Sequence, residues 1–88
     1  MSGDLTPDAT GTYKRGPRIN GEPSYSRLDN AWHVYYDDDD GWHYITTTLG
    51  VPPAPHAPGW TYIGKPLPDP AVFSPNLDAI GDATWTIL

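Results

Sequence analysis

Apolar and polar residues alternate most clearly near the middle of the chain, in the stretch AWHVYYDDDDGWHYITTT. Trp32, Val34 and Tyr36 recur at every second position before an acidic run. Trp42 and Tyr44 continue the alternation after it. A period of two is what a β-strand with one buried face requires. The stretch therefore predicts a β-hairpin whose two arms carry aromatic side chains.

The register of this predicted hairpin decides which side chains it buries. If the numbers of paired residues add to an even value, the apolar and aromatic residues share one face, whereas an odd sum mixes them with His33 and His43. We expect the even register, because it collects the aromatic side chains on one face. Either a five-residue loop, Asp37–Gly41, or a three-residue loop with Gly41 in the left-handed conformation satisfies it.

Turn-forming pairs indicate further strands on the N-terminal side of the hairpin. An Asn-Gly pair at residues 20–21 is the strongest short hairpin signal, and it separates two short strands. An Asp-Asn pair at residues 29–30 joins the second of these strands to the central hairpin. A two-residue loop there pairs Tyr25 with Val34, so three strands share one aromatic face.

Proline-rich segments follow the hairpin. Val51–Gly59 and Gly64–Pro70 are predicted to be rigid crossovers, because proline fixes φ and cannot donate a backbone hydrogen bond. Short strands are expected at Trp60–Ile63 and Thr84–Leu88. The sequence therefore predicts an all-β fold, a small antiparallel β-meander or sandwich-like domain with proline-rich crossovers.

The face shared by these strands is the predicted hydrophobic core. Each large apolar or aromatic side chain that is fully buried stabilises the fold by about 1.5–3 kcal/mol. The predicted core residues are Tyr25, Trp32, Val34, Tyr36, Trp42, Tyr44 and Trp85.

The N-terminal residues differ in composition from the rest of the chain. They are polar and contain Leu5 as the only bulky apolar residue after Met1. We expect residues 1–11 to form an extended N-terminal arm and residues 12–88 to form a single small β domain. A chain of 88 residues supports one small core, and with no cysteine it has no disulfide to stabilise that core.

Charge is distributed unevenly along the chain. Eleven acidic and five basic side chains give a net charge of -6, so we expect no nucleic-acid partner. Lys14, Arg15 and Arg18 supply three of the five positive charges. Met1 is not followed by a basic segment and then an apolar one, so we expect no signal peptide. The sequence has no long apolar run, so we expect no membrane partner.

The acidic run at residues 37–40 invites comparison with a calcium-binding loop. When Gly41 is aligned with the invariant glycine of the EF-hand loop, Thr47 stands where a glutamate is required. The match fails, and the histidines show no zinc-binding spacing. We therefore predict no metal site and no cofactor, and we interpret the acidic run as a solvated turn or an interface contact.

The sequence bears on two functional classes, enzymes and carbohydrate-binding modules. The sequence has no nucleophile motif, phosphate-binding loop or spaced carboxylate pair, so we predict that the protein is not an enzyme and has no catalytic residue. The four tryptophans and six tyrosines are enough for a carbohydrate-binding platform. Most of them are needed for the core, so a lectin-like module that binds glycans through exposed Trp or Tyr is the alternative function.

Short motifs follow one another along the chain in the order G-x-Y, N-G-x-P-x-Y, Y-Y-D, W-x-I, L-G, P-x-L and T-W-T. This order resembles a small module of bacteriophage structural proteins and of some bacterial extracellular proteins. The resemblance covers residues 11–88 and departs from the pattern at His43-Tyr44 and in the proline-rich insert. The matching residues are Tyr13, Asn20, Gly21, Pro23, Tyr25, Tyr35, Tyr36, Asp37, Trp42, Ile45, Leu49, Gly50, Pro75, Leu77, Trp85 and Thr86.

The resemblance implies a structural or binding module. A short acidic chain of this type is similar to a virion accessory protein that decorates or cements a capsid, or that is associated with the tail. Such a protein lies on the outer surface of the virion and binds the major capsid or tail protein and copies of itself. The expected interface residues are Leu5, Lys14, Arg15, Arg18, Pro52, Pro53 and Pro55.

Overall fold

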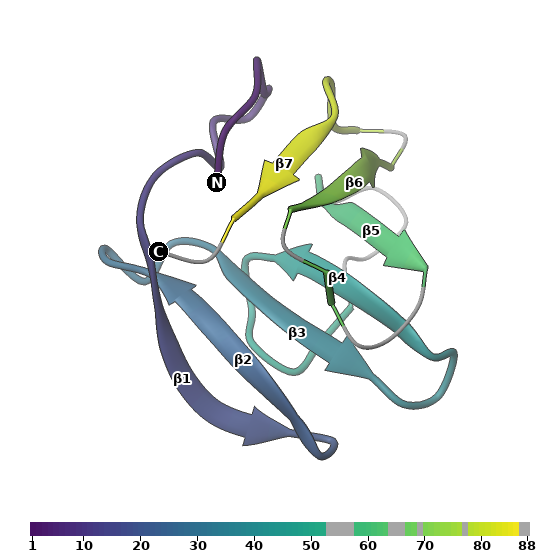
Figure 1. Ribbon diagram of the computed structural model, residues 1–88. Helices are drawn as coiled ribbons and strands as arrows, with labels where there is room; N and C mark the ends of the chain where they lie inside the picture. Colours follow the sequence, from purple (N-terminus) through teal and green to yellow (C-terminus); the bar gives the residue numbers. More distant parts are fainter. Residues whose placement is uncertain (53–57, 64–66, 69, 77, 87–88) are drawn as a thin grey trace.

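In the described part of the chain, seven β-strands, each antiparallel to the next, form one curled sheet (Figure 1). The computed structural model describes residues 1–52, 58–63, 67–68, 70–76 and 78–86. The strands are β1 (Tyr13–Ile19), β2 (Glu22–Arg27), β3 (His33–Asp37), β4 (Trp42–Thr46), β5 (Trp60–Ile63), β6 (Ala71–Pro75) and β7 (Ala83–Trp85). The predicted all-β antiparallel meander is confirmed.

The two loops between β1 and β3 agree with their sequence signals. Asn20 and Gly21 have φ values of 55° and 84°, as a two-residue hairpin turn requires, and Ile19 pairs with Glu22 beside them. Tyr25 pairs with Val34, which confirms the predicted register of β2 and β3. The Asn20-Gly21 turn has the two residues that were predicted. The second loop is longer than the predicted two residues, because β2 ends at Arg27 and β3 begins at His33, but the register across it is the predicted one.

The predicted register of the central hairpin is wrong. Val34 pairs with Ile45 and Asp37 pairs with Trp42, so paired numbers add to an odd value and the loop contains four residues. Asp side chains explain this loop length. The Asp37 carboxylate accepts a hydrogen bond from Asp39 N, and the Asp40 carboxylate accepts one from Trp42 N, both at 3.0 Å. The odd register also buries the Ile45 side chain, which contains no polar atom that would need a hydrogen-bond partner.

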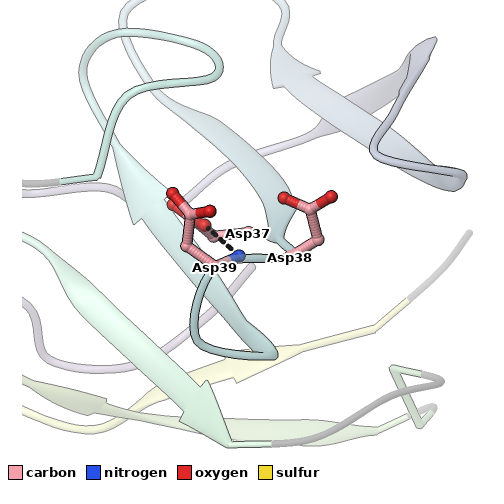
Figure 2. Close-up of side chains that lie close together, drawn as sticks. All are labelled: Asp37, Asp38 and Asp39. Carbon is pink, nitrogen blue, oxygen red and sulfur yellow. Dashed lines mark hydrogen bonds between the residues drawn. The ribbon is translucent and has the colours of Figure 1, made fainter.

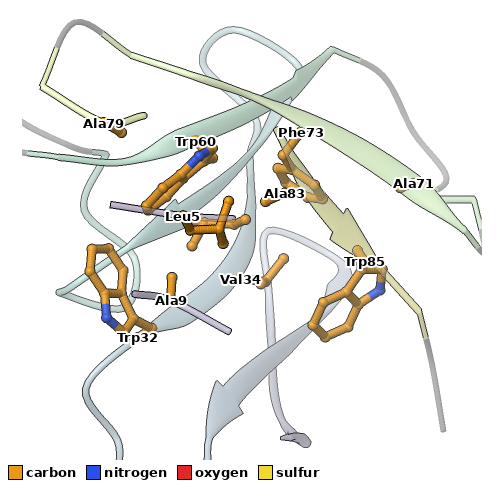
Figure 3. Packing of buried hydrophobic residues seen from close by; sticks show 11 residues of the cluster. Leu5, Ala9, Trp32, Val34, Trp60, Ala71, Phe73, Ala79, Ala83 and Trp85 are labelled. Carbon is orange, nitrogen blue, oxygen red and sulfur yellow. The ribbon is translucent and has the colours of Figure 1, made fainter. Parts of the chain in front are cut away.

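This register divides the predicted core residues between two faces of the sheet. Trp32, Val34 and Trp85 are buried in the core cluster (Figure 3). Tyr25 packs against this cluster. Tyr36 lies on the same face and is half-buried.

Tyr44 and Trp42 were wrongly predicted as core residues. Tyr44 pairs with Tyr35 on the opposite face, and Trp42 is 37% exposed. The core instead contains buried side chains that the sequence analysis did not assign to it: Leu5, Ala9, Ile45, Trp60, Ala71, Phe73, Ala79 and Ala83.

The first eleven residues do not form a separate arm. Ser2 forms a β-bridge with Thr84 of β7, and Thr6 forms one with Ile80. Leu5 and Ala9, which lie between and after these bridges, are buried in the core (Figure 3). The N-terminal segment therefore covers the outer edge of β7 and belongs to the domain.

Arg27 attaches the N-terminal segment to β2. Its Nη1 atom donates to the carbonyl oxygens of Asp8, at 2.8 Å, and of Thr10, at 3.3 Å. Its Nε and Nη2 atoms donate to both carboxylate oxygens of Asp29, at 2.8 and 2.9 Å. This bidentate pair fixes the guanidinium in the orientation that the carbonyl contacts need.

Aromatic contacts connect the first strands of the sheet with the last. The Trp85 ring of β7 lies 4.8 Å from the Tyr25 ring and 5.4 Å from the Tyr13 ring, measured between ring centroids. These separations are typical of favourable aromatic pairs. They hold the curl of the sheet although β1 and β7 are not neighbours in it.

The predicted proline-rich crossovers fall mostly outside the described residues, since positions 53–57, 64–66 and 69 are not described. The described residues contain no helix of the length and apolar character needed to cross a membrane.

Candidate functional site

The acidic turn between β3 and β4 brings three carboxylates together. Asp37, Asp38 and Asp39 each offer an oxygen, and these oxygens lie within 4.8 Å of one another (Figure 2). Asp37 is buried and accepts hydrogen bonds from Tyr35 Oη at 3.1 Å and from Asp39 N at 3.0 Å. Burial and the Asp37 hydrogen bond raise the pKa of Tyr35 above its ordinary value, so the phenol stays protonated and donates.

The Asp37 carboxylate stabilises the turn and is not free to bind a metal ion. Both of its carboxylate oxygens already accept hydrogen bonds, whereas Asp38 and Asp39 are exposed to solvent. Hard cations such as calcium take six to eight oxygen ligands. Three carboxylates supply only part of such a coordination shell, so we do not propose a metal site at this turn.

Two aromatic rings stand beside the acidic turn on the outer face of β4. The Trp42 and Tyr44 ring centroids are 6.3 Å apart, and Tyr44 Oη donates to the Asp40 carboxylate. Burial and this hydrogen bond raise the pKa of Tyr44. Trp42 therefore presents a part-exposed indole next to carboxylates, an arrangement that suits a ligand with an apolar face and hydroxyl groups.

Strand β1 carries the second charged surface. Lys14, Arg15 and Arg18 are exposed, and we call them the basic strand residues. Arg18 Nη2 donates to the Gly21 carbonyl oxygen at 2.9 Å. Among the described residues, Arg27 and Asp29 form an ion pair. The basic strand residues form no ion pair with any described residue.

The two outer edges of the sheet differ in what covers them. The β7 edge exchanges two backbone hydrogen bonds with the N-terminal segment, Ser2 N to Thr84 O at 2.9 Å and Thr84 N to Ser2 O at 2.8 Å. At the opposite end of the strand order lies β1 (Figure 1). No backbone hydrogen bond between described residues reaches its outer side.

The predicted interface residues have different locations. Leu5 is 7% exposed and lies in the domain's own core, so its prediction as an interface residue is wrong. The polar composition around it gave no indication of this contact. Pro52 is exposed, and Pro53 and Pro55 lie outside the described residues.

A serine–histidine pair on the outer face was not found from the sequence. His33 Nδ1 lies 2.7 Å from Ser26 Oγ, and burial lowers the pKa of His33. The strand register could have indicated it, because Ser26 pairs with His33 across β2 and β3. Ser26 is 8% exposed, so its hydroxyl is not accessible to a substrate, and we interpret the contact as a structural hydrogen bond.

Comparison with known proteins gives this chain no relative: no protein-family model, no curated protein and no solved structure matches it.

Proposed function

We propose that the protein is a virion structural accessory protein of the capsid decoration or cement type, located on the capsid or on the tail. It binds at contacts between major capsid or tail subunits on the outer surface of the particle. The order of motifs in the sequence supports the phage origin. The observation that carries the proposal is the basic strand β1 at the uncovered edge of the sheet.

This edge suits binding to a larger protein assembly. Its cations make no ion pair in the described part of the chain, and its charge is opposite to the net charge of -6. Opposite charges on one small domain orient it against a partner, since complementary potentials fix register more than they add affinity. The small core suits a protein that gains stability when bound, because binding to the folded state raises its stability.

The experiment mixes the purified protein with particles of the phage that carries its gene, prepared without that gene. We expect the protein to sediment with the particles and to raise the temperature at which they break. For a triple variant, K14E/R15E/R18E, the amount of protein that sediments with the particles is expected to fall by about tenfold or more. Wild-type protein that stays at the top of the gradient would contradict the proposal.

Carbohydrate binding is the second candidate, and the exposure of Trp42 favours it. Trp60 offers no ring face to a sugar, because it is fully buried and donates from Nε1 to Gly81 O at 2.8 Å. Trp42 instead presents its indole beside Tyr44 and Asp40. This combination offers a stacking surface next to hydrogen-bond acceptors.

A glycan array separates this candidate from the first. We expect any glycan signal to disappear in Trp42→Ala and to persist in Leu28→Ala, which removes another exposed apolar side chain. Both variants should melt close to the wild type, because neither residue is buried. An array without signal, or one with equal signals for the two variants, removes the carbohydrate candidate.

A further inference from the structure

We infer that the outer edge of β1 binds an acidic, extended segment of a partner protein, which joins the sheet as an additional strand. This rests on the proposed function, because it specifies the chemistry of the surface that the protein recognises. Backbone direction, side-chain charge and the shape of the edge each support it.

Backbone direction shows which groups on β1 are available. Leu28 N donates to Thr12 O at 3.1 Å, so Thr12 faces β2. Backbone groups of successive strand residues point to opposite sides, and Tyr13 and Arg15 therefore direct their N–H and C=O groups away from β2. Arg27, which pairs with Tyr13, supports this assignment, because its N–H donates to Trp32 O and therefore points away from β1. Each outward residue offers one donor and one acceptor to a new strand.

Side-chain charge defines the sequence that this strand should have. Lys14 pairs with Ser26 and Arg15 pairs with Tyr25, so their side chains start on opposite faces of the sheet. A partner strand with two consecutive Asp or Glu residues places one carboxylate near each cation. Opposite charges across neighbouring strands stabilise a sheet, and like charges destabilise it.

The same charges exclude a second β1 edge as the partner. Antiparallel pairing of two β1 strands would bring Lys14 and Arg15 of one copy against the same residues of the other. The irregularity between Arg15 and Arg18 also limits the length of any added strand, and Pro17 within it has no N–H. The edge therefore admits a short acidic strand and opposes pairing with itself.

Nucleic acid is the competing anionic ligand, and the backbone favours protein. Phosphate groups would use the cations but not the alternating donors and acceptors of Tyr13 and Arg15. An added strand uses both. Binding should weaken as salt is raised, because screening acts over about 8 Å at physiological ionic strength.

The test uses a fluorescein-labelled peptide of eight residues that carries two Asp-Glu pairs in a background of Val and Thr. We expect saturable binding to the wild type, measured by fluorescence anisotropy, and slower amide hydrogen exchange at Tyr13 and Arg15 in the complex. A peptide with Asn and Gln in place of the acids should bind about tenfold more weakly, or worse. A peptide methylated on the backbone nitrogens along one edge keeps its charge and should lose binding if that edge pairs with β1.

A matched pair of variants isolates the basic edge. K14Q/R15Q and T47E/T48E change the net charge by the same two units, and all four side chains are exposed. We expect weaker peptide binding in K14Q/R15Q and near wild-type binding in T47E/T48E. Should K14Q/R15Q fail to fold, the exchange measurement on the wild type still decides, because it needs no variant.

Three results would overturn the inference. They are an acidic peptide that does not bind, a set of backbone-methylated peptides that all bind as well as the parent, and a DNA duplex that binds more tightly through Lys14 and Arg15. Particles that recruit the protein without protecting the Tyr13 and Arg15 amides would refute the added strand and leave the proposed function standing. Binding of the peptide without recruitment of the protein to particles would refute the proposed function and leave the added strand standing.

Discussion

The two edges of the sheet show opposite solutions to one problem. An outer strand exposes unpaired N–H and C=O groups, which invite pairing with other chains. At β7 the N-terminal segment takes up these groups through Ser2 and adds Leu5 and Ala9 to the core. At β1 no backbone hydrogen bond between described residues covers the edge, which carries the exposed Lys14 and Arg15. The comparison separates an edge that the chain covers itself from an edge that no described segment covers.

Removing the anchor of the covered edge should have the largest effect. Leu5→Ala is expected to lower the free energy of unfolding by about 2–4 kcal/mol, because it leaves a cavity in the core. Leu28→Ala is the control, since Leu28 is 61% exposed and its loss should cost less than about 0.5 kcal/mol. Urea unfolding measures both. Equal midpoints for the two variants would mean that the N-terminal segment does not contribute to the core.

A pair of tryptophan variants measures how the covered edge is tied to β5. Trp60 donates from Nε1 to Gly81 O, next to the bridge that Ile80 makes with Thr6. Trp85 Nε1 is buried and has no hydrogen-bond partner within the described part of the chain. Trp60→Phe should therefore destabilise the protein by about 1–3 kcal/mol more than Trp85→Phe does. Thermal unfolding of both variants checks the order, and the reverse order would contradict it.

Loosening the N-terminal segment from β2 should have a smaller effect. Arg27→Gln removes the contacts to the Asp8 and Thr10 carbonyls and is expected to cost about 1 kcal/mol. Amide exchange at Ser2 and Thr6 should become faster, because the segment opens more often. Arg18→Gln on the open edge is the control. Unchanged exchange in Arg27→Gln would show that the bridges alone hold the segment.

Acid should weaken the same attachment by a small amount. Hydrogen bonds from Arg27 lower the pKa of Asp29 from 3.8 to about 2. The carboxylate therefore stabilises the folded state above its ordinary pKa, and this contribution is lost as the pH falls through about 2. The urea midpoint measured between pH 5 and pH 2 should fall less steeply in Asp29→Asn. Identical profiles would show that the pair with Arg27 has no effect on stability.

The sequence was sufficient for the fold class because short loops leave few choices. The registers predicted at the Asn20-Gly21 turn and across the Asp29-Asn30 pair are both confirmed, although the second loop contains more than two residues. In the acidic loop the register depends on which Asp side chain binds which backbone N–H. Neither composition nor alternation contains that information, so the face of Tyr44 was predicted wrongly.

The candidate surfaces were predictable to different degrees. The basic residues of β1 are visible in the sequence, and they are exposed as a charged strand usually is. Whether an edge is open depends on a contact between residues far apart in the chain, here Ser2 with Thr84. Burial of Leu5 depends on the same contact. Sequence periodicity reports local structure and therefore missed both.

Trp85 gives the protein a built-in optical probe of its open edge. Its indole packs against Tyr13 of β1 and Tyr25 of β2, so a change in the curl of the sheet alters the electronic coupling of these rings. Near-ultraviolet circular dichroism reads that coupling directly. The Trp85 indole N–H is buried without a hydrogen-bond partner among the described residues, so its emission should differ from that of the part-exposed Trp42. A segment that docks beside Tyr13 can be followed in the unlabelled protein by the spectrum of a residue it never touches.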